Sequence, residues 1–223
     1  MVKSERIKDI EFGNNSVEAK FDVHSGGVKG SILLLPGIGS GPFGGIFDQF
    51  VEKAVEENFQ VLRYESWEDV SELQEKTVDS IFAEINDAVD YLKDRNDLKV
   101  FIVAKSFSAG MVLAGSIDNV DKTVLWAPAV GFQEKANIEE LRDSKLGEVE
   151  EVTDIQINSE FLEHKVPVKV IHGENDQVVQ IENSESIVHN LPEAEIKRIS
   201  ETGHSYEGKK NLVIEETIEF LNQ

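Results

Sequence analysis

The stretch Val103-Ala104-Lys105-Ser106-Phe107-Ser108-Ala109-Gly110 decides the fold class, because it joins a mainly apolar run to a helical segment. A strand is predicted over 99–104, and a helix from the serine to about residue 117. A serine at a tight strand-to-helix turn needs small neighbours, since bulky side chains two positions away would clash. Ala104 and Ser108 are small, so the segment predicts a nucleophilic Ser106. The plain alternative is a helix cap, for which Ser108 is a candidate.

Apolar runs that end in turn residues alternate with amphipathic stretches along the chain. This alternation is typical of strand–helix–strand units, so we expect an α/β fold with a mostly parallel central sheet and helices on both faces. Further strands are predicted over 31–35, 60–64, 122–126, 166–172 and 195–199, and helices over 46–58, 72–95, 182–190 and 209–221. Residues 7–12 and 16–23 are expected to form an antiparallel edge of that sheet.

A charged, weakly periodic segment interrupts this pattern at 131–165. A loop of that length inside a compact domain is usually functional or carries short helices of its own. We therefore expect one domain over 1–223, with 131–165 as a short cap insertion.

An acid and a histidine follow the last two predicted strands. With Ser106 they give the order serine, Asp176, His204, and each lies just beyond the carboxyl end of a strand, where ligands bind in open parallel sheets. Taken alone, His204 is typical of a surface histidine and Asp176 of a turn. Three agreeing placements favour a catalytic set, in which Glu174 and Asp154 are weaker candidates for the acid.

Four segments resemble the α/β-hydrolase superfamily. HGENDQVV (172–179) resembles its acid turn, ETGHSY (201–206) its histidine loop, AKSFSAG (104–110) its nucleophile elbow, and LLLPGIGSG (33–41) its strand and oxyanion loop. The resemblance covers about residue 31 to the C-terminus. The small size resembles dienelactone-hydrolase-like and short-chain carboxylesterase members.

The sequence departs from the usual pattern at Ala104 and Ser108, where the elbow commonly has glycine, and at Pro36, where many members have histidine. These departures leave the subfamily open.

The resemblance implies a role for each residue. Ser106 would attack an acyl carbon, His204 would accept its proton and return it to the leaving group, and Asp176 would hold the imidazole tautomer. The backbone N–H groups of Ile38 and Phe107 would form the oxyanion hole. The expected function is hydrolysis of a small or medium acyl ester through an acyl-enzyme intermediate, with no cofactor. Thioester, amide and acyl transfer to an acceptor other than water remain open.

Phe43 and Trp126 are candidates to wall an acyl pocket, and the plain alternative for both is ordinary core packing.

Composition excludes several classes of protein. The chain has no cysteine, and 43 acidic against 22 basic residues give a net charge of −21, which disfavours nucleic acid and anionic membranes as partners. No apolar run approaches the ~20 residues of a membrane span, and the charged N-terminus does not read as a signal peptide. We expect a cytoplasmic protein that acts on a small molecule. The histidines show no metal-site spacing, and His172 is expected to pack under the acid turn.

Two alternatives of other classes remain. Gly39-Ser40-Gly41-Pro42-Phe43-Gly44 matches the dinucleotide-binding pattern, with Glu65 in the place of the ribose-binding acid. Against it, Pro42 removes a backbone N–H from the loop that would hold the phosphates. The other alternative is a catalytically silent binding module or a peptidase on the same fold.

Overall fold

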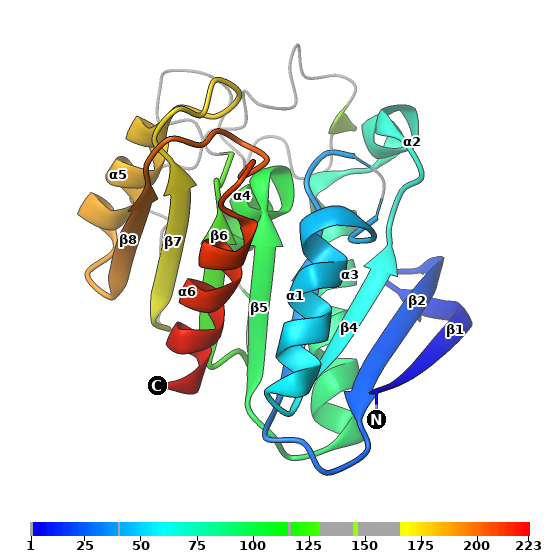
Figure 1. The fold of residues 1–223 in the computed structure, drawn as a ribbon. Helices are drawn as coiled ribbons and strands as arrows, with labels where there is room; N and C mark the ends of the chain where they lie inside the picture. The colour runs from blue at the N-terminus through cyan, green and yellow to red at the C-terminus, as the bar shows by residue number, and fades with distance from the viewer. Residues whose placement is uncertain (1, 40, 116, 130–144, 147–165) are drawn as a thin grey trace.

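The computed structural model describes residues 2–39, 41–115, 117–129, 145–146 and 166–223, and its central feature is a twisted sheet between two layers of helices (Figure 1). The strands are β1 (Val2–Phe12), β2 (Asn15–His24), β3 (Gly30–Leu35), β4 (Phe59–Glu65), β5 (Val100–Lys105), β6 (Lys122–Trp126), β7 (Val168–Gly173) and β8 (Ala194–Ile199). The helices are α1 (Gly45–Glu56), α2 (Val70–Glu75), α3 (Val78–Arg95), α4 (Ser106–Ala114), α5 (Ile181–Asn190) and α6 (Lys210–Asn222).

The eight strands follow the order β1-β2-β4-β3-β5-β6-β7-β8. β1 pairs with β2 and β2 with β4 in antiparallel fashion, and every later pair is parallel. The chain therefore starts at one edge, passes over one position to β3, returns to β4 beside β2, and then crosses to β5 on the other side of β3. The carboxyl ends of β3, β5, β7 and β8 consequently meet along one rim of the sheet, where ligands bind in folds of this class.

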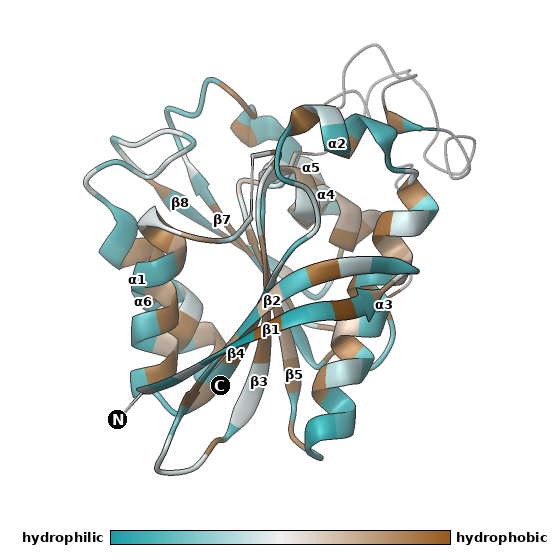
Figure 2. Cartoon of the chain, turned by 90° about the vertical axis from the view of Figure 1, so that its right-hand side faces the viewer, coloured by the Kyte–Doolittle hydropathy of each residue, from teal (hydrophilic) through white to brown (hydrophobic). Residues whose placement is uncertain are grey.

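Each face of the sheet is covered by its own helices, and the two faces hold separate apolar cores. α1 and α6 cover one face, where Phe50 and Val213 pack on Ile32 and Val103. α3, α4 and α5 cover the other face (Figure 1). The central strands are consequently apolar on both sides, as Figure 2 shows by hydropathy, and β3 and β7 are buried along their whole length. Such strands form a rigid support for the loops at the rim.

The predicted α/β architecture is confirmed, including the antiparallel edge formed by β1 and β2. The prediction of one helix over 72–95 is wrong. The chain forms α2 and α3 instead, because Asp69 and Thr77 each accept backbone N–H groups as N-caps and Lys76 and Thr77 are extended. The free carbonyl of Lys76 accepts the N–H of Leu146, a fully buried residue.

The predicted cap, 131–165, lies outside the described residues except for Lys145 and Leu146. The single-domain prediction for 1–223 stays a prediction.

Candidate active site

Ser106 stands at the sharp turn between β5 and α4. Its backbone has φ of +51°, in the left-handed region that residues with a side chain rarely adopt. Such strain persists only where the surrounding structure enforces it, and it is concentrated at functional sites. Gly37 fits closely against the turn, since a Cβ at that position would lie 3.3 Å from the Cβ of Ser106. The turn therefore holds the serine hydroxyl at the sheet rim.

Small residues surround the turn, as the sequence predicts. Ala104 is fully buried and Ser108 is 2% exposed, so larger side chains have no room at either position. α4 begins at Ser106 and its N-cap is Lys105, whose side chain makes no capping hydrogen bond. Ser108 is therefore not the cap of this helix.

The acid turn follows β7 and holds Asp176 in a fixed orientation. The carboxylate Oδ1 accepts the backbone N–H of Val178 at 2.8 Å and of Val179 at 2.9 Å. The Asp176 side chain is fully buried. One carboxylate oxygen is therefore occupied by its own turn, and Oδ2 is left for side chains.

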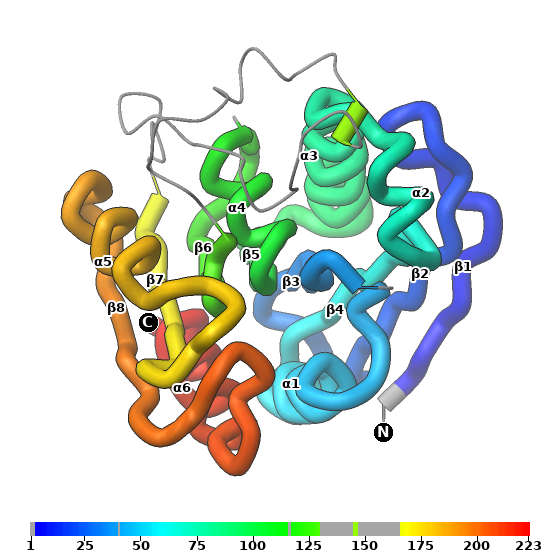
Figure 3. Tube along the Cα trace, turned by 90° about the horizontal axis from the view of Figure 1, so that it is seen from above, coloured from blue at the N-terminus to red at the C-terminus, as the bar shows by residue number. Residues whose placement is uncertain are grey.

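The histidine loop between β8 and α6 lies beside the acid turn, as Figure 3 shows from above the rim. The Asn175 N–H donates to the Thr202 carbonyl at 3.0 Å. Gly173 makes this approach feasible, because a Cβ there would lie 2.6 Å from that same oxygen. The buried Tyr206 hydroxyl donates to the carbonyl of Ile171 at 2.7 Å and fixes the loop from below.

The structure brings the three predicted residues into one hydrogen-bonded chain. His204 Nδ1 lies 2.7 Å from Asp176 Oδ2, and His204 Nε2 lies 3.1 Å from Ser106 Oγ. A carboxylate only accepts hydrogen bonds, so Nδ1 carries the proton and Nε2 offers its lone pair to the serine O–H. This is the arrangement in which an imidazole can remove the hydroxyl proton.

Charges around the site favour an ionised acid. Burial alone raises the pKa of Asp176, but hydrogen bonds from His172, His204 and the two turn N–H groups outweigh burial and hold the pKa far below its ordinary value. Lys105 shows the opposite balance. Burial lowers the pKa of Lys105 to about 8, although Asp176 and Glu207 attract its charge.

Ile38 and Phe107, the expected oxyanion donors, both lie beside Ser106. Phe107 is in the first turn of α4, where backbone N–H groups have no partner inside the helix. Ile38 follows Gly37 in the loop after β3, and both line the cavity at Ser106. Trp67 joins the two segments: its Nε1–H donates to the carbonyls of Ile38 at 3.2 Å and Gly39 at 3.1 Å. Its ring also packs edge-on against that of Phe107, with centroids 5.9 Å apart.

A cavity of about 420 Å³ opens at Ser106 and His204. The loop after β3 and the start of α1 contribute part of the lining. Ser205 of the histidine loop and Lys210 of α6 also line the cavity. The glycine-rich loop that also suggested dinucleotide binding thus lies against the serine. Volumes of this size are typical of small-molecule sites.

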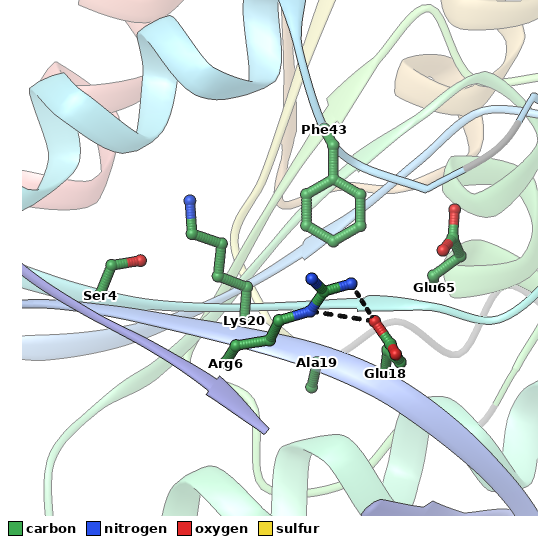
Figure 4. Close-up of a pocket in the computed structure, with 7 residues that line it drawn as sticks. All are labelled: Ser4, Arg6, Glu18, Ala19, Lys20, Phe43 and Glu65. Carbon is green, nitrogen blue, oxygen red and sulfur yellow. Dashed lines mark hydrogen bonds and ion pairs between the residues drawn. The ribbon is translucent and has the colours of Figure 1, made fainter. Parts of the chain in front are cut away.

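Phe43 lines this cavity and is 40% exposed, and its role as a wall of an acyl pocket stays a prediction. Its ring also forms a wall of a second pocket of about 370 Å³, next to Lys20 and Glu65 (Figure 4). The buried guanidinium of Arg63 donates to the carbonyl of Pro42 at 3.1 Å and lies 5.1 Å from the Phe43 ring centroid, which holds the phenylalanine in place.

Trp126 does not line the cavity. It is fully buried between α1 and α6, where its Nε1–H donates to Thr217 Oγ1 at 3.0 Å and its ring packs on Phe47 and Phe50. The prediction of a pocket wall at Trp126 is therefore corrected to core packing. The cause is its position near the end of β6, on the face covered by these helices.

Across the described ranges, no group of three or more His, Asp or Glu side chains is arranged to hold a metal ion. No described helix combines the length and the apolar character needed to cross a membrane.

Several solved structures share the fold of this chain. A dienelactone hydrolase from Anabaena variabilis superposes with a TM-score of 0.72 and 18% identity, covering 98% of this chain and 96% of that chain. The chain has the α/β-hydrolase fold. Est1E from Butyrivibrio proteoclasticus, solved with ferulic acid bound, matches with a TM-score of 0.77 and 17% identity over 95% and 96% of the two chains. Thermogutta terrifontis esterase 2, phosphoramylated by tabun, matches with a TM-score of 0.68 and 11% identity, covering 97% of this chain and 94% of that chain. No protein-family model and no curated protein matches the sequence.

Within this α/β-hydrolase fold, sequence reasoning missed the supporting residues of the site. Trp67 contacts both the loop after β3 and the ring of Phe107, and no local sequence pattern indicates either contact. The sequence predicts that His172 packs under the acid turn, and it does so. The sequence does not indicate its hydrogen-bond partners, which are the hydroxyl of Ser184 and the carbonyl of Val179.

Proposed function

We propose that this chain is a serine hydrolase that cleaves a small or medium acyl ester through an acyl-enzyme intermediate. The observation that carries the proposal is the hydrogen-bonded chain from Ser106 Oγ through His204 to the buried Asp176 carboxylate. The α/β-hydrolase fold adds support, since solved neighbours with this fold are described as esterases and hydrolases.

In the first half of the proposed reaction, Ser106 Oγ bonds to the acyl carbon while its proton moves to His204 Nε2. The tetrahedral intermediate then breaks its bond to the alcohol oxygen, which leaves with the proton from His204. In the second half, water attacks the acyl-enzyme and gives a proton to His204. The Ser106 oxygen leaves with that proton, so the products are the acid and the alcohol. Asp176 stays ionised and stabilises the imidazolium in both halves.

The negative oxygen of each intermediate needs donors that do not have to reorganise. The N–H groups of Phe107 and Ile38 are proposed for this role, because one lies at the start of α4 and the other in the loop packed against Ser106. The partial positive charge at the N-terminus of α4 favours the same oxygen.

The substrate class follows from the cavity. A volume of about 420 Å³ with phenylalanine and isoleucine side chains suits a small or medium acyl group. The same tetrahedral chemistry serves thioesters and amides, so a chain-length series on p-nitrophenyl esters that also includes one thioester and one amide defines the preferred bond.

The decisive variant is Ser106→Ala, with Ser108→Ala as the matched control. Both serines are buried in the first turn of α4, but only Ser106 contacts His204. We expect Ser106→Ala to abolish hydrolysis of short p-nitrophenyl esters with the fold intact, and Ser108→Ala to retain it. Equal activity in Ser106→Ala and the wild type would overturn the proposal. A wild type that binds esters without turnover would instead indicate the silent module.

A further inference from the structure

A second histidine contacts the acid from behind. His172 lies near the end of β7, four residues before Asp176, and is fully buried. Its Nε2 lies 3.2 Å from Asp176 Oδ2, the same oxygen that accepts from His204 Nδ1 at 2.7 Å. The carboxylate therefore lies between two imidazoles, of which only His204 reaches Ser106.

The partners of His172 define its tautomer. Its Nε2 lies 2.9 Å from the carbonyl oxygen of Val179, and carbonyl and carboxylate oxygens accept only, so Nε2 carries a proton. Its Nδ1 lies 2.6 Å from the hydroxyl of Ser184, a fully buried residue of α5 that can donate to it. The neutral imidazole thus has a single Nε2–H, which it shares between the Val179 carbonyl at 2.9 Å and Asp176 Oδ2 at 3.2 Å.

We propose that His172 is a positioning residue for the acid: fixed by Ser184, it donates to Asp176 Oδ2 and keeps that carboxylate ionised and aimed at His204. The inference rests on the proposed hydrolase function.

The physical argument concerns how much freedom the carboxylate has. Val178 and Val179 fix Oδ1, so rotation about the carboxylate is limited on that side only. Without His172, Oδ2 would accept from His204 alone. Hydrogen bonds donated to a carboxylate stabilise its charged form, so a buried carboxylate that loses a donor has a higher pKa. A more basic Asp176 would stabilise the protonated form of His204 more strongly.

This reasoning fixes the sign of the expected pH effect. Only neutral His204 can accept the Ser106 proton, so activity rises as the imidazolium loses its proton. Removal of the His172 donor should therefore move the acidic limb of the kcat/KM profile to higher pH. The other described ionisable groups that interact with this carboxylate are Lys105 and Tyr206, and neither is changed in the test.

The test compares His172→Phe, which removes both ring nitrogens, with His172→Gln, whose amide N–H can reach toward Asp176. Hydrogen-bond partners of metal-ligating histidines and carboxylates change activity by about 10–100-fold, and we take the same scale for a partner of Asp176. We expect a loss of kcat in that range for His172→Phe with KM little changed, and recovery of most of it in His172→Gln. Ser184→Ala should show the same pH displacement in smaller degree. Thr217→Val, which removes a buried hydrogen bond to Trp126, should show no displacement.

Two further readouts keep the outcomes separate. Thermal unfolding of each variant reports on folding, and if His172→Phe does not fold, His172→Gln and Ser184→Ala carry the test. NMR titration of the His204 ring measures the same displacement without turnover, so it decides the inference even if Ser106→Ala leaves hydrolysis unchanged and the proposed function fails. Folded His172→Phe with a wild-type His204 titration would overturn the inference, as would a folded His172→Gln that recovers nothing.

Discussion

Replacing Asp176 with asparagine tests the central geometry through a change of one atom. Asp176 Oδ1 accepts two backbone N–H groups at 2.8 and 2.9 Å, and Oδ2 accepts from His204 at 2.7 Å. An asparagine must place its carbonyl oxygen on one side and its NH₂ on the other. With the oxygen toward His204, the NH₂ would face two backbone donors, and each buried N–H left without an acceptor costs about 1–3 kcal/mol.

In the opposite orientation the carbonyl oxygen lies on the turn and the NH₂ faces His204 and the His172 Nε2–H, which keeps the Val179 carbonyl as its acceptor. That orientation is therefore favoured. The NH₂ donates, so His204 must expose the Nδ1 lone pair and carry its proton on Nε2. An imidazole with its proton on Nε2 cannot accept the proton of Ser106, 3.1 Å away. We expect kcat to fall by about 10⁴-fold, the size of the analogous change in a serine protease, which corresponds to about 5.4 kcal/mol of transition-state stabilisation.

The assay is steady-state hydrolysis of p-nitrophenyl butyrate by folded Asp176→Asn. Glu174→Gln is the matched control, because this exposed carboxylate lies in the same turn and should be dispensable. A loss smaller than about tenfold in Asp176→Asn would refute the reasoning, and a large loss in Glu174→Gln would reassign the acid.

Three more predictions follow from the same site. Trp67→Phe removes the donor to the carbonyls of Ile38 and Gly39. We expect steady-state kinetics to show a fall in kcat of about tenfold with KM nearly unchanged, because oxyanion donors act mainly in the transition state. A raised KM at constant kcat would contradict this. The wild-type rate should rise with pH because His204 must be neutral to act, and a flat profile from about pH 5 to 8 would count against that base. Lys105 has its pKa lowered by burial from 10.5 to about 8, so its charge destabilises the fold below pH 8 and this penalty shrinks as pH rises toward 10.5. Urea unfolding should therefore show Lys105→Met more stable than wild type at pH 7 and less so at pH 10, and an equal or reversed difference would contradict the sign.

The strands were the most predictable part of the molecule. Continuous apolar runs such as that of β3 can only be buried on both faces, and the segments around Ser106 and Asp176 follow strands of this kind. The segment around His204 follows β8, an edge strand of alternating sequence that is mostly part-exposed. A parallel sheet then brings the carboxyl ends of these strands to one rim. For that reason the placement of these three side chains could be anticipated from sequence order alone.

Contacts between elements were beyond the reach of local patterns. The break between α2 and α3 depends on Thr77 as a cap, which an uninterrupted helical pattern concealed. The sequence suggests a pocket position for Trp126 because this residue ends a strand at the rim, but strand position does not say which layer covers the side chain. The bridge from Trp67 to Ile38 and Phe107 joins three segments that are separated in sequence, so only the folded chain reveals it.

The most direct test of the account is covalent labelling of the wild-type chain with a fluorophosphonate probe, followed by mass spectrometry of its peptides. An activated serine should take one probe on Ser106, and the Ser106→Ala and Asp176→Asn chains should take almost none. A probe on another residue, or no probe on a folded wild type, would contradict the assignment of Ser106 as the nucleophile.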